Sequence, residues 1–235
     1  MWFGGEFLKN FTTVLTQGLK AADGIPVWVM MANSLVMALG IAIGKIAISI
    51  TAAYAIVYFR FPGRELCFVL IFITLMMPVE VRIVPTFQVA ANLNFSDSSL
   101  GLVLPLIASA TATFLYRQMF MTIPAELLEA ARIDGAGPWR FFVDVVLPLS
   151  RTNTAALFVV LFIYGWNQYL WPLLVTNQES MYTIVMGIQR MVNIPDAVPE
   201  WNLVMAVALL GMLPPLLVVL GMQKLFVRGL VETEK

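Results

Sequence analysis

The segment MTIPAELLEAARIDGAGPWRFFVDVVLPLS, residues 121–150, lies between two long apolar stretches and predicts a pair of short helices. Pro124 suits the first turn of a helix, because its missing N–H removes no hydrogen bond there. Glu126 in that turn opposes the positive end of the helix dipole. Glu129 and Arg132 stand three residues apart, a spacing that favours an ion pair on the helix surface.

The rest of the segment predicts a turn and a second helix. Gly135 stands where a helix commonly ends in a left-handed residue, Pro138 suits the next helix start, and Pro148 its end. The two helices carry many apolar or small side chains: Leu127, Leu128, Ala130, Ala131, Trp139, Phe141, Phe142, Val145 and Val146. So large an apolar surface outside a bilayer is typical of an interface with another protein. Packing on the membrane or on the chain's own helices explains the same pattern, and the residues alone leave both interpretations open.

The composition of the whole chain is that of a membrane protein. Of its 235 residues, 60% are hydrophobic and only 12% are charged, whereas soluble domains are about 25% charged. A helix of about 20 apolar residues spans a bilayer core, and five segments meet this requirement: residues 27–59, 66–87, 100–120, 154–175 and 203–227. We therefore expect an all-α polytopic membrane protein with about five transmembrane helices, in which residues 1–235 form one domain.

The distribution of Lys and Arg predicts the orientation, because cytoplasmic loops carry the excess of these residues. One side has nine: Arg60, Arg64, Arg117, Arg132, Arg140, Arg151, Lys224, Arg228 and Lys235. The other side has three: Lys9, Lys20 and Arg190. We expect the loop 121–150 and the tail 228–235 in the cytoplasm. Residues 1–26 are then outside, as an amphipathic helix on the outer interface or as a frayed tail.

Several kinds of chemistry are excluded by composition. The chain has no His and a single cysteine, Cys67, which removes disulfides, Cys/His zinc sites and His-dependent catalytic triads. Its formal net charge is zero, so nothing points to nucleic acid. We expect no catalytic residue, metal or cofactor, and no enzymatic activity in this chain.

The hairpin segment resembles a known motif. Glu129-Ala130-Ala131, two further residues, Asp134-Gly135-Ala136 and a downstream Leu147-Pro148 are similar to the EAA loop of ABC-importer permeases. In that family the loop docks into a cleft on the cytoplasmic ATPase. The resemblance therefore implies an ATPase-coupling role for five residues: Glu129, Ala130, Ala131, Asp134 and Gly135.

The likeness extends beyond the hairpin. Asn33-Ser34 and residues 59–62, 78–82, 162–174 and 226–231 resemble carbohydrate-type permeases, and more narrowly those of sn-glycerol-3-phosphate importers. The resemblance implies a type I importer fold in the bacterial inner membrane, a homologous sister permease, a pair of ATPase subunits and an external binding protein. It implies glycerol-3-phosphate, a glycerophosphodiester, or another sugar or polyol as substrate. Family members normally have six spans, so we expect either a misplaced start or a five-helix subunit.

Two groups of polar residues within apolar segments are candidates for the substrate pathway. The proline-flanked stretch 78–85 predicts a broken helix, a feature that transporters place beside the pathway, and it carries Glu80 and Arg82. An Arg there can attract a phosphate; charge compensation at a subunit interface is the alternative. The second group is Tyr164, Asn167 and Gln168, whose aromatic and amide groups suit polyol hydroxyls. Aromatic residues at a span end are equally typical of a membrane interface.

Lys45 is a further charge within a predicted span, and Gly40 and Gly44 beside it would let a second helix approach closely. An ion-coupled carrier using Lys45, Glu80 and Arg82 is therefore an alternative to an importer subunit. Such carriers usually show duplicated halves, which this sequence lacks. A non-transporting assembly factor is a third possibility, and it predicts no effect of ATP.

Overall fold

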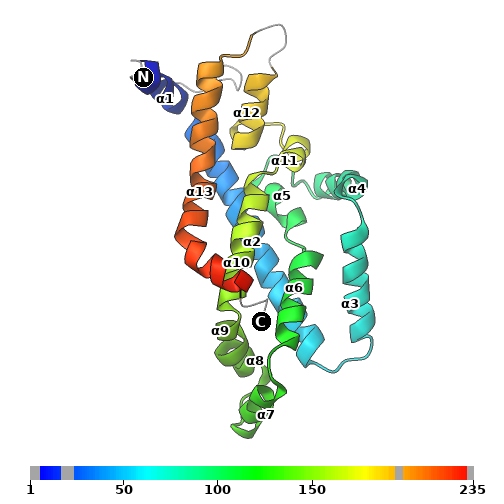
Figure 1. The fold of residues 1–235 in the computed structure, drawn as a ribbon. Coiled ribbons are helices and arrows are strands. Elements are labelled where there is room, and N and C mark those ends of the chain that lie inside the picture. Colours follow the sequence, from blue (N-terminus) through cyan, green and yellow to red (C-terminus); the bar gives the residue numbers. More distant parts are fainter. Residues whose placement is uncertain (1–5, 17–23, 194–197, 232–235) are drawn as a thin grey trace. The chain divides into compact units, whose positions relative to one another are not determined.

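The computed structural model describes residues 6–16, 24–193 and 198–231, and for residues 75, 79, 80 and 224–231 it describes the backbone alone (Figure 1). Every named element in these ranges is a helix, which confirms the predicted all-α class. The chain divides into two compact units, and each is described by itself. Unit 1 comprises Met1–Ile41, Ile83–Pro105 and Phe162–Leu220, and unit 2 comprises Ala42–Arg82, Leu106–Leu161 and Gly221–Lys235.

Three long helices contribute to both units: α2 (Val27–Tyr58), α10 (Arg151–Trp166) and α13 (Trp201–Val231). Unit 1 also contains α1 (Glu6–Thr16), most of α4 (Val79–Asn92) and of the 3-10 turn η3 (Leu104–Leu106), α5 (Ser99–Val103), α11 (Leu170–Val175), the 3-10 turn η5 (Glu179–Met181) and α12 (Ile184–Val192). Unit 2 also contains α3 (Arg64–Ile73), the 3-10 turn η2 (Thr74–Met76), α6 (Ala110–Met121), α7 (Ala125–Ile133), α8 (Pro138–Phe141), the π-helical turn η4 (Phe142–Val146) and α9 (Leu147–Leu149).

Among the described residues, two helices are long and apolar enough to cross a membrane by themselves, α2 and residues Trp201–Gln223 of α13. Two bent pairs raise the number to four if each pair is one span. They are Ser99–Leu106 with Ala110–Met121, bent by 48°, and Pro138–Leu149 with Arg151–Trp166, bent by 71°. Four of the five predicted apolar segments therefore overlap candidate spans.

The predicted segment 66–87 is not one helix. Helical structure stops at Met77, whose ψ is 118°, and α4 begins after Pro78. The cause is Pro78, because a proline disfavours the helical conformation of the residue before it. Pro85 lies inside α4 and does not end it, so the break is placed before Glu80 and Arg82.

The predicted segment 154–175 is also divided. α10 ends at Trp166 and α11 starts at Leu170, so Asn167, Gln168 and Tyr169 form a non-helical connection. The polar pair Asn167-Gln168, directly after Trp166, is the sequence feature that marks the break. Two of the three predicted pathway residues of this region therefore lie between helices.

Small residues on α2 admit close neighbours within each unit. A Cβ added to Gly40 would lie 2.8 Å from Val103, and one added to Gly44 would lie 2.5 Å from Ile107. The prediction that a second helix approaches is met at Gly40, because Val103 ends α5, whereas Ile107 beside Gly44 lies in the connection between η3 and α6. Gly165 of α10 behaves in the same way, because its Cβ would lie 2.9 Å from the Cα of Ala38.

Two buried tryptophans bond carbonyl groups that prolines leave without a helical partner. The indole N–H of Trp166 donates to the carbonyl of Gly211 at 3.1 Å, and that of Trp171 donates to the carbonyl of Gly101 at 3.0 Å. Four positions after each accepting glycine stands a proline that supplies no N–H, Pro215 within α13 and Pro105 in η3. An unpaired carbonyl inside a membrane is costly. The two indoles therefore stabilise two proline-containing helices of unit 1.

Polar residues near the start of α2 fix the chain before α12. The Asn33 amide donates to the carbonyls of Ser180 and Tyr182 at 2.7 and 3.0 Å. The Ser34 hydroxyl accepts the backbone N–H of Ile184 at 2.8 Å. Because Ile184 is the first residue of α12, Ser34 satisfies one of the free N–H groups of that helix.

The predicted amphipathic helix near the N-terminus is present as α1. Val14 is buried, and the rings of Phe7 and Phe11 lie 4.8 Å apart. The side chains of Asn10 and Asn202 are hydrogen-bonded at 3.0 Å, which connects α1 to α13. Its location on the outer membrane surface stays a prediction.

The core of unit 2 is an aromatic cluster that joins α2, α6 and the segment from α8 to η4. Its buried members are Ile50, Ala53, Tyr54, Tyr116, Phe120, Phe141, Phe142 and Val146. Beside it, α3 packs on α6, where the guanidinium carbon of Arg117 lies 4.0 Å from the ring centroid of Phe68. The cluster holds the residue 121–150 region on the end of α2.

Candidate functional site

The first helix of the predicted hairpin is α7, and it ends in a Schellman motif. Gly135 has a φ of +74°, the left-handed conformation predicted for it. The N–H of Gly135 donates to the carbonyl of Arg132 at 3.1 Å, and the N–H of Ala136 donates to that of Ala131 at 2.8 Å. These two bonds define the motif and turn the chain sharply toward α8. Nothing lies within 4 Å of a Cβ added to Gly135, so only the backbone conformation restricts this position.

The second helix of the hairpin is continuous from α8 through η4 to α9 and widens in the middle. The N–H of Leu147 donates to the carbonyl of Phe142, five residues earlier, which makes this turn π-helical. Pro148 accounts for the wide turn, because its ring would clash with the carbonyl of Asp144 and it has no N–H to offer. Sequence reasoning placed the helix end at Pro148; the structure continues one residue further, to Leu149.

Two other expectations for the hairpin need correction. Pro124 occupies the N-cap position and α7 starts at Ala125, one residue later than predicted. The structure has no ion pair between Glu129 and Arg132 among its described residues. Arg132 instead lines a cavity between α7 and the end of α2.

The five predicted coupling residues lie together around the end of α7. Glu129, Ala130, Asp134 and Gly135 are exposed, and Ala131 is half-buried. Two large apolar side chains near them are strongly exposed, Ile133 at 86% and Trp139 at 72%. Small exposed residues beside large exposed apolar ones form a surface that another protein can approach closely.

The opposite side of the hairpin is fixed to α2. The Tyr54 hydroxyl donates to the carbonyl of Pro138 at 2.6 Å, and the Tyr54 ring lies 4.8 Å from that of Phe142. The rings of Tyr58 and Phe141 meet edge to face at 5.3 Å. In Figure 1 the hairpin formed by α7 and α8 lies beyond the end of α6, within unit 2. The second hairpin helix is therefore anchored to the end of α2 through packed aromatic rings.

The predicted pathway residues are distributed over both units. Arg82 is exposed on α4 and belongs to unit 2. Tyr164 is 37% exposed on α10, Asn167 is exposed in the connection after it, and both belong to unit 1. Gln168 is half-buried, and its amide donates to the carbonyl of Tyr164 at 3.2 Å. This bond caps the end of α10, a structural role that sequence reasoning missed.

Two further predicted charges are placed differently. The side chain of Glu80 lies outside the described part of the structure, so its predicted role stays a prediction. Lys45 is 8% exposed within α2, close enough to Arg82 for the two positive charges to interact. Both residues belong to unit 2, so the α2 helix and the start of α4 bring two cations together there.

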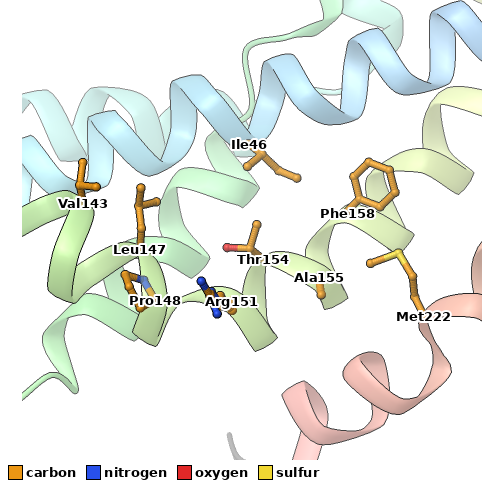
Figure 2. Close-up of a pocket in the computed structure, with 9 residues that line it drawn as sticks. All are labelled: Ile46, Val143, Leu147, Pro148, Arg151, Thr154, Ala155, Phe158 and Met222. Atoms are coloured by element: carbon orange, nitrogen blue, oxygen red, sulfur yellow. The ribbon is translucent and has the colours of Figure 1, made fainter.

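Sequence reasoning missed a cavity of about 530 Å³ in unit 2, which Figure 2 shows. Its lining residues are Ile46, Val143, Leu147, Pro148, Arg151, Thr154, Ala155, Phe158 and Met222. Most are apolar, and Arg151 lies at the bend between α9 and α10. Thr154 accepts a hydrogen bond from the Tyr116 hydroxyl at 2.9 Å. The only sequence signal was Arg151, three residues after Pro148 of the Leu-Pro pair.

In unit 1, the side chain of Asp97 connects two loops. Its carboxylate accepts the backbone N–H groups of Gln178 at 2.8 Å and Asn177 at 2.5 Å. The bond from Gln178 is the main reason that the pKa of Asp97 lies below its ordinary value, and the Asn177 bonds act in the same direction. The backbone N–H of Asp97 also donates to the carbonyl of Val175 at 3.0 Å. The loops before α5 and after α11 are thereby held together.

Comparison with known proteins identifies the class. The model of the family described as binding-protein-dependent transport system inner membrane component matches residues 45–232. The sn-glycerol-3-phosphate transport system permease proteins UgpE of Yersinia pestis and Agrobacterium fabrum are 65% and 59% identical to this chain. Each match covers 232 residues, 99% of this chain and 82% of the relative. The chain belongs to the family of inner membrane components of binding-protein-dependent transport systems.

A solved structure agrees with this at the level of the fold. One chain of a bacterial ABC transporter involved in the import of the acidic polysaccharide alginate has a TM-score of 0.79 and 22% sequence identity. The match covers 92% of this chain and 78% of that chain. It confirms the type I permease fold expected from the sequence.

Proposed function

We propose that this permease is a membrane subunit of an ATP-driven importer of sn-glycerol-3-phosphate, with glycerophosphodiesters as further substrates. The support is the group of relatives at 58–65% identity, which cover 99% of the chain and are named as permeases for that solute. In this proposal the chain forms half of the pathway and has no catalytic residue of its own. ATP hydrolysis belongs to a partner subunit.

The observation that carries the coupling role is the asymmetry of the hairpin. The end of α7 is exposed, whereas Phe141 and Phe142 of the second helix are buried in the aromatic core of unit 2. Glu129, Ala130, Ala131, Asp134 and Gly135 are the proposed contact with the ATPase. Movement of that ATPase would shift α7 and, through Tyr54 and its neighbours, the end of α2. Coupling of this kind requires that each state of the permease bind its ligands with different affinity.

The proposal includes an orientation and a set of partners. Nine Lys and Arg residues against three favour a cytoplasmic C-terminus and a cytoplasmic hairpin. The partners are a homologous sister permease, a pair of cytoplasmic ATP-binding subunits and an external solute-binding protein. This arrangement supports the use of the exposed end of α7 as a cytoplasmic docking surface.

The substrate contacts are proposed from residue chemistry. Arg82 can bind a phosphate with two parallel hydrogen bonds, and Lys45 adds a second positive charge near it. Tyr164, Asn167 and Gln168 offer hydroxyl and amide groups to a polyol, although the amide of Gln168 already bonds the carbonyl of Tyr164. Glu80 stays a candidate of the same pathway.

The test is reconstitution of this chain with its sister permease, ATPase and binding protein in liposomes. ATP hydrolysis is measured with sn-glycerol-3-phosphate, glycerophosphocholine, maltose or no solute. We expect stimulation by the phosphorylated polyols alone. Stimulation by maltose alone would reassign the permease to another sugar, and solute accumulation driven by an ion gradient without ATP would favour the ion-coupled carrier.

A further inference from the structure

A second cavity, of about 390 Å³, lies between the hairpin and the end of α2. Its lining residues are Tyr54, Tyr58, Phe59, Arg60, Leu128, Ala131, Arg132, Ala136, Pro138 and Phe141. The aromatic and aliphatic members make its walls apolar, and the two arginines are its only charged residues among those that the structure describes. All ten residues belong to unit 2, so one compact body forms the whole cavity.

The two arginines of this cavity differ from three other arginines of unit 2, each of which lies near a carboxylate. Arg64 lies 3.3 Å from Glu65, Arg117 lies 3.8 Å from the same carboxylate, and Arg140 lies 3.3 Å from Asp144. Neither Arg60 nor Arg132 makes a salt bridge or side-chain hydrogen bond with any residue in the described ranges. No Asp or Glu in those ranges lines the cavity. The cavity therefore has an excess of positive charge that an anion would neutralise.

The position of the cavity along the chain indicates which anion is available. Arg60 follows the last residue of α2, a candidate membrane span, by two positions. The residues on either side of it, Phe59 and Phe61, are 43% and 37% exposed, so apolar surface flanks Arg60 just beyond the end of the span. Basic pockets at such positions bind the head groups of anionic lipids.

We propose that this cavity binds the head group of an anionic phospholipid. Arg60 and Arg132 would hold the phosphate, and Phe59, Leu128 and Phe141 would pack against the glycerol and the first methylenes. A lipid bound there would contact both the end of α2 and α7, because Arg60 follows α2 and Arg132 lies on α7. Membrane composition would then change how firmly the hairpin is held, independently of the transported solute.

The test uses the full chain in a neutral detergent, titrated with dioleoyl-phosphatidylglycerol or dioleoyl-phosphatidylcholine, with bound lipid measured by native mass spectrometry. We expect phosphatidylglycerol to bind more tightly. Arg60→Gln and Arg132→Gln should each weaken its binding about fivefold, because one Arg near an anionic membrane surface contributes on that order. Arg64→Gln and Arg140→Gln are the matched controls and should leave it unchanged, because both arginines lie outside the cavity.

Several results would overturn this proposal. Equal binding of the two lipids, or equal effects of Arg60→Gln and Arg64→Gln, would show that the cavity does not select anionic head groups. Displacement of the lipid by millimolar inorganic phosphate or sn-glycerol-3-phosphate would show a site for a soluble anion instead. If Arg60→Gln does not fold, Arg132→Gln on the exposed helix α7 and a salt titration with the unaltered chain decide the question. Binding that does not weaken with salt would contradict the proposal, because exposed charge pairs are screened.

Discussion

The hydroxyl of Tyr54 on α2 donates a hydrogen bond of 2.6 Å to the carbonyl of Pro138, the first residue of the second hairpin helix. This bond connects a candidate membrane span directly to the proposed coupling element. The ring of Tyr54 adds contacts with Tyr58 at 5.1 Å and with Phe142 at 4.8 Å. Tyr54 is therefore the residue through which we expect hairpin movement to reach α2 most directly.

Replacing Tyr54 by Phe should weaken this connection and leave the ring packing intact. The loss of one hydrogen bond costs roughly 1 kcal/mol of stability. We expect ATPase attachment to be retained and the amount of solute transported per ATP hydrolysed to fall, as measured in proteoliposomes. Tyr58→Phe is the matched control, because the Tyr58 hydroxyl lies at the longer distance of 3.4 Å from the carbonyl of Phe120. An equal loss in both variants would contradict a special role for Tyr54.

Gly135→Ala should destabilise the hairpin through the backbone alone. Ala in a left-handed conformation costs roughly 1 kcal/mol, and no neighbour would clash with the new Cβ. We expect weaker binding of the ATPase, measured by co-purification. Gly137→Ala provides the control, since Gly137 has a φ of −71° and an equally open surrounding. If Gly137→Ala reduced binding as much as Gly135→Ala, the turn conformation would not be the cause.

Trp171→Phe should leave the carbonyl of Gly101 unpaired, at a cost of about 1–3 kcal/mol. We expect a lower thermal unfolding midpoint in detergent, and a much smaller change for Trp139→Phe, because Trp139 is 72% exposed. Pro105→Ala would restore a backbone N–H at the position that normally bonds this carbonyl. The effect of Trp171→Phe should therefore be smaller in the Pro105→Ala background, and an unchanged effect would contradict our account of the bond.

The loop contact of Asp97 should make stability depend on acidic pH. Its folded pKa is lowered, so the carboxylate stabilises the fold above its ordinary pKa of 3.8, and this stabilisation is lost as the pH falls through the lower folded value. Asp97→Asn, which tolerates the φ of 54°, should unfold at a lower temperature than the unaltered chain at pH 7. The two should converge once the pH lies below that folded value. The exposed Asp144→Asn should show little difference at either pH, and a constant gap for Asp97→Asn would argue against its charge as the cause.

The sequence was sufficient to predict features that depend on neighbouring residues. The hairpin, its left-handed Gly135 and the approach of other segments to Gly40 and Gly44 all follow from local spacing, and the structure agrees with each. The break near Pro78 was also predictable, because proline acts on the residue just before it.

Features that depend on distant residues could not be predicted. Trp171 and Gly101 are 70 positions apart, and Tyr54 and Pro138 are 84 positions apart. No pattern in one sequence identifies such pairs. The end of α10 at Trp166 was missed because the polar residues that follow it, Asn167 and Gln168, were interpreted as pathway residues within one continuous span. The cavity around Arg151 was missed because residues far apart in the sequence line it, from Ile46 to Met222.

Binding-protein-stimulated ATP hydrolysis by the reconstituted importer, with sn-glycerol-3-phosphate as solute, tests the coupling role most directly. Ala130→Trp places a large side chain on the exposed end of α7, and Asp144→Asn changes the same hairpin away from the proposed contact. We expect stimulation in the unaltered complex and in Asp144→Asn, and its loss in Ala130→Trp with the permease still folded. Full stimulation in Ala130→Trp would contradict the claim that this end of α7 is where the ATPase acts on the permease.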